Sequence, residues 1–284
     1  MSSPTDMQLI DTHQHLILRG RLGYSWTAGI PALAEKSFTP EDYSVLTQDR
    51  GVVGTVFMEA GVDDADYQAE ARYFAGLVGQ GGMLGQIASC RPELDEGFDA
   101  WLEECEGLHV VGFRRILHVV DDAISQSETF LHNLRKIGRK GLPFDLCFFA
   151  RQHGLAERLL NACPDQVFVL DHCGNPDIAG SGFAPWAESL RRLAEFPNLF
   201  IKFSGIPTNC SGRPVTAEVL RPYTDHMLAC FGPERTLWGG DWPVVDINSS
   251  LPEWIDLTRE LCRGLSPDEQ RLLGVGTARQ VYRI

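Results

Sequence analysis

Leu9-Ile10-Asp11-Thr12-His13-Gln14-His15 is the stretch from which the fold of this 284-residue chain can be worked out. It joins a short apolar run, residues 7–10, to two histidines at positions i and i+2. Side chains two residues apart at the end of a strand point to the same face of a sheet, so both imidazoles can reach one metal ion or one substrate oxygen. The pair is equally compatible with two ordinary surface or core histidines. Its meaning therefore depends on the rest of the chain.

Short apolar runs recur along the chain and alternate with segments of helical pattern. The runs predict strands at residues 7–10, 52–58, 83–88, 109–113, 143–149, 166–170, 199–203 and 236–238. Helices are predicted at residues 39–49, 63–78, around 98–102, 127–138, 154–163, 183–196, 217–231, 251–262 and 267–273. Thr39 is the predicted N-cap of the first helix, because a proline and two acidic residues follow it.

Eight strands alternating with helices over this length predict an α/β fold, a single (β/α)8 TIM-type barrel that fills residues 1–284 as one domain. The competing doubly wound sheet usually has a glycine-rich first turn, whereas here the first strand leads into histidines. The longest irregular segment, residues 16–38, contains Tyr24 and Trp26. We expect this segment to cover a site.

Composition excludes several classes of function. With 44% apolar and 22% charged residues the chain can bury a large core, and its net charge of −13 argues against nucleic acid or an anionic membrane as partner. The eight cysteines show no close pairing, which argues against a zinc knuckle or a disulfide framework. Residues 1–8 lack the features of a signal peptide, and no run approaches the roughly 20 apolar residues of a membrane span. We therefore predict a cytoplasmic protein.

Polar side chains stand at the carboxyl ends of the predicted strands, where a barrel of this kind builds its sites. They are His13, His15, Glu59, Arg114, His172, Lys202 and Asp241. Most also have a purely structural explanation, such as a solvated loop carboxylate for Glu59 or a surface ion pair for Arg114. Asp241 is the hardest to explain in this way, because it follows Gly239 and Gly240, which let the backbone approach another group closely.

These residues resemble the amidohydrolase superfamily, with HxH after the first strand, a histidine after the sixth and an aspartate after the eighth. The finer pattern resembles the "amidohydrolase 2" lactonases, which act on sugar-acid lactones such as fuconolactone and rhamnonolactone, on muconolactone-type compounds and on pyrone dicarboxylate. The segments that carry the resemblance are residues 11–15, 24–26, 112–114, 169–176, 201–205 and 239–243. They span almost the whole chain.

The sequence departs from the superfamily at two positions that a binuclear metal site needs. Arg114 stands where a bridging lysine would follow the fourth strand, and the fifth strand ends in Cys147-Phe148-Phe149 with no histidine before His153. The resemblance therefore implies at most one divalent ion, with Zn²⁺ the first choice. The predicted ligands of this mononuclear site are His13, His15 and Glu59. Activity without a metal is left open, because the resemblance extends to members with and without an ion.

We predict a hydrolase that opens the ring ester of a small polar lactone, with a sugar-acid lactone as the favoured substrate. Asp241 is the predicted general base and then acid, and His172 and Arg114 are predicted to polarise the carbonyl or stabilise the oxyanion. The predicted substrate-binding residues are His13, His15, Trp26, Lys202 and Trp242. The expected partner is the small-molecule lactone, and a homo-oligomer is left open.

Two alternative functions remain. A non-oxidative, metal-dependent decarboxylase would share the barrel and the HxH motif but, by resemblance, would need a histidine at the end of the fifth strand. A catalytically silent barrel that acts as a binding protein would be expected to have lost Asp241 or His172, and both are present.

Overall fold

A computed structural model describes residues 7–180 and 182–284, so most of the N-terminal segment discussed above lies outside the described residues. Eight parallel strands pair in the order of the sequence and form one barrel-like sheet. They are β1 (Leu9–Gln14), β2 (Val52–Met58), β3 (Met83–Ser89), β4 (Val110–Ile116), β5 (Phe144–Cys147), β6 (Phe168–Leu170), β7 (Leu199–Phe203) and β8 (Thr236–Trp238). The predicted (β/α)8 barrel is confirmed.

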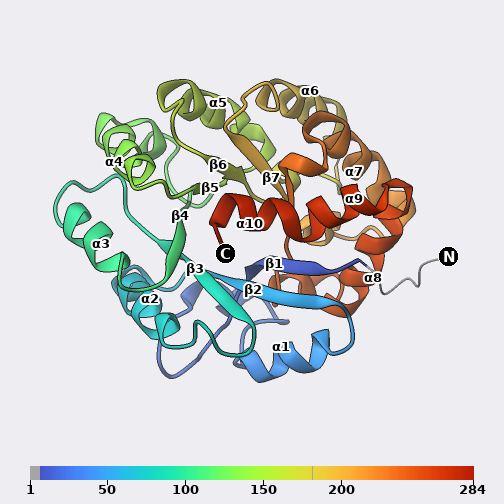
Figure 1. Cartoon of the computed structure of the whole chain (residues 1–284), viewed down its shortest axis with the longest axis horizontal. Helices are drawn as coiled ribbons and strands as arrows, with labels where there is room; N and C mark the ends of the chain where they lie inside the picture. Colours follow the sequence, from blue (N-terminus) through green and yellow to red (C-terminus); the bar gives the residue numbers. More distant parts are fainter. Residues whose placement is uncertain (1–6, 181) are drawn as a thin grey trace.

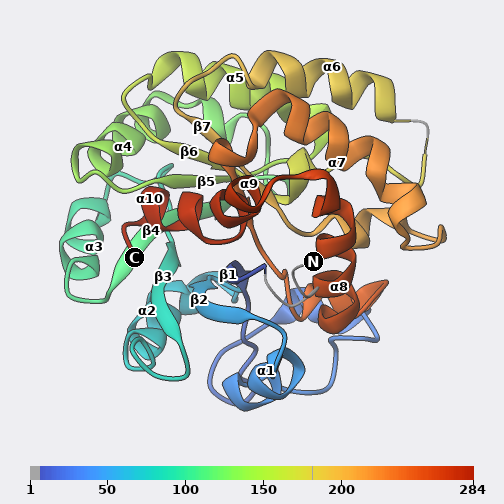
Figure 2. The same cartoon turned by 45° about the vertical axis from the view of Figure 1, so that its right-hand side comes forward.

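Most helices of the described residues surround the strands on the outside of the barrel, and the last one lies across one end of it (Figures 1 and 2). The helices are α1 (Pro40–Thr47), α2 (Tyr67–Ala75), α3 (Phe98–Cys105), α4 (Glu128–Arg139), α5 (His153–Ala162), α6 (Phe183–Leu193), α7 (Ala217–Phe231), α8 (Leu251–Leu261), α9 (Pro267–Arg271) and α10 (Thr277–Tyr282). Thr39 caps α1 as predicted, since its hydroxyl accepts a hydrogen bond from the backbone N of Asp42 at 3.2 Å. In the described ranges, every helix is too short or too polar to span a bilayer.

β1 and β4 continue beyond their predicted ends, and both extensions carry predicted site residues. β1 extends to Gln14 instead of stopping at Ile10, and β4 extends to Ile116 instead of stopping at Phe113. His13 and Arg114 therefore lie inside strands, where both are buried. An apolar pattern does not detect such extensions, because the added residues are polar side chains that find their partners inside the protein.

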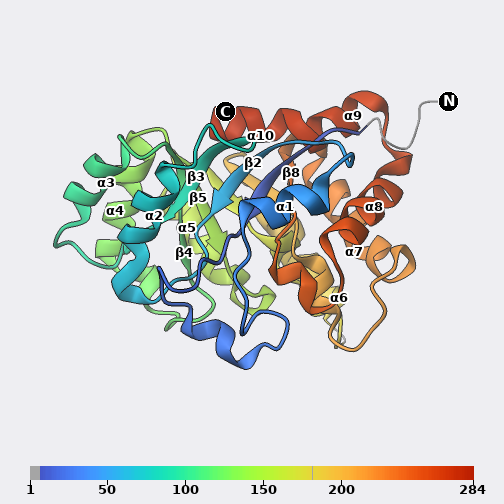
Figure 3. The ribbon, with the colours of Figure 1, turned by 90° about the horizontal axis from the view of Figure 1, so that it is seen from below.

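The C-terminal segment closes one end of the barrel. Beyond α9 the chain continues through residues 272–276 into α10, whereas the sequence predicted a helix ending at residue 273. Figure 3 shows α10 at the end of the barrel opposite the long segment that follows β1. Tyr282 packs there with Ile10 and Val56 from the strands, and its hydroxyl donates to the carboxylate of Asp145 at 3.0 Å.

The barrel closes between β8 and β1 through Asp11. Its Oδ1 accepts hydrogen bonds from the backbone N of Gly240 at 2.7 Å and of His13 at 2.9 Å. A Cβ atom on Gly240 would lie 2.5 Å from Asp11 Oδ2, so only glycine fits at this seam. The backbone N of Asp241 then donates to the carbonyl of His13 at 2.9 Å. The sequence predicted that Gly239 and Gly240 let the backbone approach another group closely, and that group is β1. This approach fixes Asp241 beside His13.

α2 contributes a buried acid behind the second strand. Oε1 of Glu70 accepts a hydrogen bond from the backbone N of Ala60 at 3.0 Å. Burial, reinforced by the negative charge of Glu59, raises the pKa of Glu70 well above its usual value. The folded protein therefore keeps Glu70 protonated at a pH where the unfolded chain has lost that proton.

Replacing Tyr282 with Phe should lower the free energy of unfolding by roughly 1–3 kcal/mol, because Oδ1 of the buried Asp145 loses its hydroxyl donor while Lys202 still binds Oδ2. Denaturant unfolding of Tyr282→Phe measures the loss. Tyr73→Phe, a change at a half-buried tyrosine of α2, is the matched control and should have a smaller effect. Equal losses in the two variants would contradict a special role for the Tyr282 hydroxyl.

Glu70→Gln should stabilise the protein by an amount that grows with pH. In the unfolded chain the carboxyl of Glu70 loses its proton near its ordinary pKa of 4.5, so wild-type stability is penalised as the pH rises above that value. Glutamine keeps the acceptor and never ionises. Melting temperatures of both proteins at about pH 4 and about pH 8 give the comparison. A pH-independent difference would show that Glu70 does not titrate as proposed.

Candidate active site

A pocket of about 240 Å³ opens at the carboxyl ends of the strands. Five of the predicted site residues line it, namely His15, Trp26, Arg114, His172 and Asp241. A larger hollow of about 520 Å³, between α1 and the start of β2, is lined by other residues. Size alone therefore does not locate the site, but the gathering of titratable side chains at the strand ends does.

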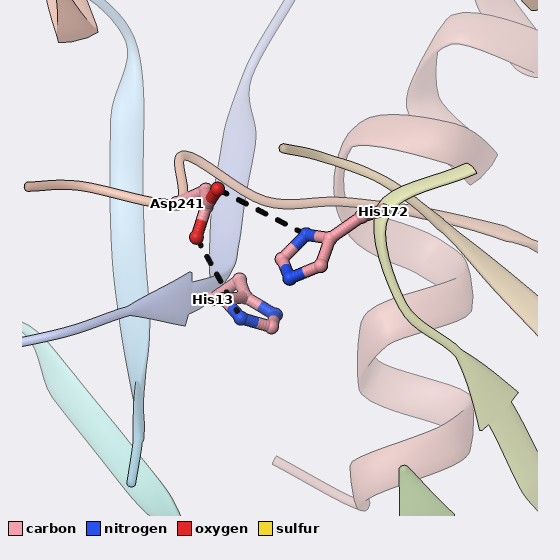
Figure 4. A group of neighbouring side chains, drawn as sticks. All are labelled: His13, His172 and Asp241. Carbon is pink, nitrogen blue, oxygen red and sulfur yellow. Dashed lines mark ion pairs between the residues drawn. The ribbon is translucent and has the colours of Figure 1, made fainter. Parts of the chain in front are cut away.

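His13, His172 and Asp241 converge beneath this pocket (Figure 4). One nitrogen or oxygen atom from each lies within 4.8 Å of the others. His13 Nε2 is 3.8 Å from Asp241 Oδ1, and His172 Nδ1 is 4.0 Å from Asp241 Oδ2. His15 Nε2 approaches Asp241 Oδ1 to 3.6 Å. Residues from β1 and from the segments after β6 and β8 thus meet at one carboxylate.

Hydrogen-bond partners decide which imidazole nitrogens carry a hydrogen. Nδ1 of His15 lies 3.0 Å from the carbonyl oxygen of Met58, which only accepts, so Nδ1 carries a hydrogen and Nε2 is the nitrogen that faces Asp241. Nε2 of His13 lies 3.1 Å from Nη1 of Arg114, which only donates, so this nitrogen carries a lone pair. The Nε2 atoms of both histidines therefore lie near one carboxylate oxygen. A bound cation would stabilise this arrangement.

His13 and His172, which lie beside Asp241, are neutral at pH 7. Burial lowers the pKa of His13 well below its usual value, and burial also lowers the pKa of His172. Neutral imidazole is the form that coordinates a metal ion and accepts a hydrogen bond. The donor set of His13, His15, His172 and Asp241 consequently fits a single divalent ion, although the lone pair of His13 accepts from Arg114 in this structure.

The backbone holds two of these residues in an uncommon conformation. His172 has φ = 57° and Asp241 has φ = 55°, in the left-handed region that few residues other than glycine adopt. Gly205 packs directly on the His172 ring, since a Cβ atom there would lie 2.2 Å from Nδ1. Ser204 Oγ is 3.1 Å from the same nitrogen. Strained backbone held by its surroundings is typical of functional sites.

Five charged residues form a buried network behind the pocket. Arg114, which is 3% exposed, donates to Glu59 Oε1 at 2.6 Å and to Asp171 Oδ2 at 3.3 Å. Lys202 pairs with Asp145, and its Nζ lies 3.4 Å from Asp171 Oδ1. Burial opposes ionisation of Asp171, but Lys202, His13 and Arg114 together outweigh burial and hold the pKa of Asp171 well below its usual value. The network is ionised and nearly balanced in charge.

Glu59 belongs to this network and not to the group formed by His13, His172 and Asp241. Its Oε1 accepts from Arg114, and its Oε2 accepts from the backbone N of Gly61 at 2.9 Å. Because both oxygens are engaged, the geometry does not support Glu59 as a metal ligand beside His13. The solvated carboxylate considered for Glu59 and the surface ion pair considered for Arg114 are wrong, since both side chains are buried.

Lys202 and Trp242, like His13, are predicted substrate-binding residues that do not line the pocket. Lys202 is fully buried inside the barrel, with Nζ 3.3 Å from Nδ1 of His13. Trp242 is 1% exposed, packs edge-on against Phe38 at a centroid distance of 5.3 Å, and donates from Nε1 to Asp246 at 3.1 Å. A direct contact with substrate, as predicted for both, is therefore not supported by the geometry. Trp26 does line the pocket, and its Nε1 donates to the carbonyl of Ala60 at 3.0 Å.

Sequence reasoning missed His118 and gave no role to Cys147. Both line the pocket, and Cys147 Sγ lies 3.2 Å from His118 Nδ1. A strand places every second side chain on the same face, and Arg114, Ile116 and His118 are spaced two residues apart. This spacing would have indicated that His118 faces the same side as Arg114. It was overlooked because β4 was predicted to end at Phe113.

Known proteins resemble this chain along most of its length. The L-fucono-1,5-lactonase of Burkholderia multivorans is 27% identical, over 97% of this chain and 96% of its own. The 2-pyrone-4,6-dicarboxylate hydrolase of Comamonas testosteroni is 24% identical, over 86% of this chain and 79% of its own. A solved amidohydrolase structure from Burkholderia multivorans with bound zinc shares the fold, with a TM-score of 0.88 at 24% identity over 98% of this chain and 99% of the other. A model of the amidohydrolase family matches residues 10–284, and the chain belongs to that family.

Proposed function

We propose that this protein is a hydrolase that opens the ring ester of a small lactone, with Asp241 as the group that moves protons. The observation that carries the proposal is the convergence of His13, His172 and Asp241 at the strand ends. The relatives named as lactonases support lactone hydrolysis in general. A sugar-acid lactone remains the substrate that resemblance favours.

Asp241 is placed to transfer a proton twice. Its carboxylate accepts a proton from a water molecule as the water oxygen attacks the lactone carbonyl carbon. The same proton then passes to the ring oxygen as the carbon–oxygen bond breaks, which yields the hydroxy acid. The imidazoles of His15 and His172 flank this carboxylate, at 3.6 Å and 4.0 Å.

The negative charge that develops on the carbonyl oxygen needs a positive partner. Arg114 lines the pocket, and its guanidinium is held in place by Glu59 and Asp171. A preorganised donor of this kind stabilises an oxyanion without having to reorganise during the reaction. Arg114 and His172 are therefore the residues proposed to assist Asp241.

His13, His15, His172 and Asp241 are the residues that would hold a divalent ion. This set replaces the predicted His13, His15 and Glu59, because the oxygens of Glu59 are already engaged. Zn²⁺ suits nitrogen and carboxylate ligands, and when bound it would polarise the lactone carbonyl.

The alternative functions have less support from the geometry. The decarboxylase was expected to need a histidine at the end of β5, and the residue there is Cys147, whose Sγ faces His118. A silent binding barrel would not need Asp241 and His172 to be held together in strained backbone conformations.

Asp241→Asn should lower kcat for lactone opening by roughly 10²–10⁴-fold, because asparagine cannot accept the proton. Asp246→Asn is the matched control, since Asp246 lies in the same loop and accepts from Trp242 through an oxygen that asparagine retains. Proton release follows activity, and circular dichroism follows the fold. Unchanged kcat in Asp241→Asn would exclude the proposed role.

Protein purified without chelator should contain about one Zn²⁺ per chain, and removal of the ion should lower both activity and melting temperature. His172→Gln should lose the metal, whereas His118→Gln, a change at another histidine of the pocket, should retain it. Elemental analysis and thermal unfolding with and without added Zn²⁺ give the readouts. Metal-free protein with full activity and unchanged stability would contradict the site.

A further inference from the structure

The wall of the pocket beside Asp241 is mainly apolar. Trp26, Ile116, Val119 and Val244 line it. Val119 is 69% exposed and Trp26 is 40% exposed, so the apolar surface continues out to solvent. Such a surface favours ligand groups that also gain free energy by leaving water.

The pocket offers little positive charge to a substituent of the substrate. Among the described residues that line it, Arg114 is the only permanent cation. Its guanidinium is bound by Glu59 at 2.6 Å and by Asp171 at 3.3 Å, and what remains is proposed to serve the oxyanion. A divalent ion beside Asp241 would likewise serve the ring ester. A carboxylate on the substituent would therefore have to compete with these two acids or with the reacting carbonyl. The net charge of −13 adds repulsion at longer range.

The polar side chains of Cys147 and His118 on the same wall are paired with each other through one nitrogen of the ring. Cys147 Sγ and His118 Nδ1 are 3.2 Å apart. Burial lowers the pKa of His118 to about 4 and raises the pKa of Cys147, so both groups are neutral at pH 7 and the thiol can donate to the imidazole. Hydroxyl groups of a polyol would lose water against Ile116 and Val119 without gaining partners there, which weakens binding.

We propose that the pocket takes a small uncharged lactone with an apolar substituent, which Trp26, Val119 and Val244 contact while the ring ester lies beside Asp241. This inference rests on the proposed lactone hydrolysis and narrows its substrate away from sugar acids and carboxylated lactones. The volume of about 240 Å³ suits a single ring with a short substituent.

Three γ-butyrolactones that differ only at the γ carbon test this substrate class. The substituents are isopropyl, hydroxymethyl and carboxylate, and isopropyl and carboxylate have similar size. We expect kcat/KM to be highest for isopropyl, at least about tenfold above carboxylate, with hydroxymethyl between them. Proton release at constant pH measures all three, and a sugar-acid lactone is included in the same assay.

Val119→Lys adds a cation to the apolar wall at an exposed position. It should raise kcat/KM for the carboxylate lactone several-fold and lower that for the isopropyl lactone, which loses an apolar contact. Val45→Lys is the matched control, because Val45 is 73% exposed on α1 and does not line the pocket. It should behave as the wild type.

The outcomes separate this inference from the proposed function. Faster opening of the carboxylate, hydroxymethyl or sugar-acid lactone than of the isopropyl lactone would overturn the inference while lactone hydrolysis stands. No gain for the carboxylate lactone in a folded Val119→Lys variant would also overturn it, since the substituent would then lie elsewhere. If the wild type opens none of these lactones, the proposed function is wrong.

Discussion

The ion pairs inside the barrel are the constraint on which the site depends. Arg114 and Lys202 share one acceptor, Asp171, and Asp171 also lies 3.5 Å from Nδ1 of His13. Removing one member would leave a buried charge uncompensated, at a cost of roughly 3–5 kcal/mol. With the whole network in place, His13 directs Nε2 toward Asp241. A buried salt bridge thus sets the orientation of a side chain that the proposed chemistry uses.

The seam of the barrel and the site are built from the same residues. Asp11 binds the backbone of Gly240, and the next residue along the chain, Asp241, donates its backbone N–H to His13. Closing the sheet therefore places the carboxylate beside the imidazole. Because the seam fixes the backbone, Asp241 can be held at a positive φ that an unconstrained loop would relax.

The pocket divides into two regions with different physical character. Its base carries charged and titratable groups, with Arg114 and Asp241 held by other parts of the barrel. Its outer wall, with Ile116 and Val119, is apolar. In the proposed reaction the base would serve the bond-breaking step, whereas the outer wall would contact what surrounds the ring. This division explains how one barrel can keep the same hydrolytic residues while the accepted substituent changes with a few loop side chains.

The sequence by itself determined the fold class and the main site residues. Alternating apolar and amphipathic segments predicted the barrel, with the limits of β7 and β8 correct, and strand ends indicated His13, His172 and Asp241. Only the tertiary structure decided which polar side chains face the pocket. Lys202 on β7 pairs with Asp145 on β5, 57 residues away in the sequence, so its burial depends on a contact across the barrel interior that no local pattern contains. A local pattern shows where a strand ends. Whether a charged side chain there faces the pocket or a buried ion pair depends on partners from other strands.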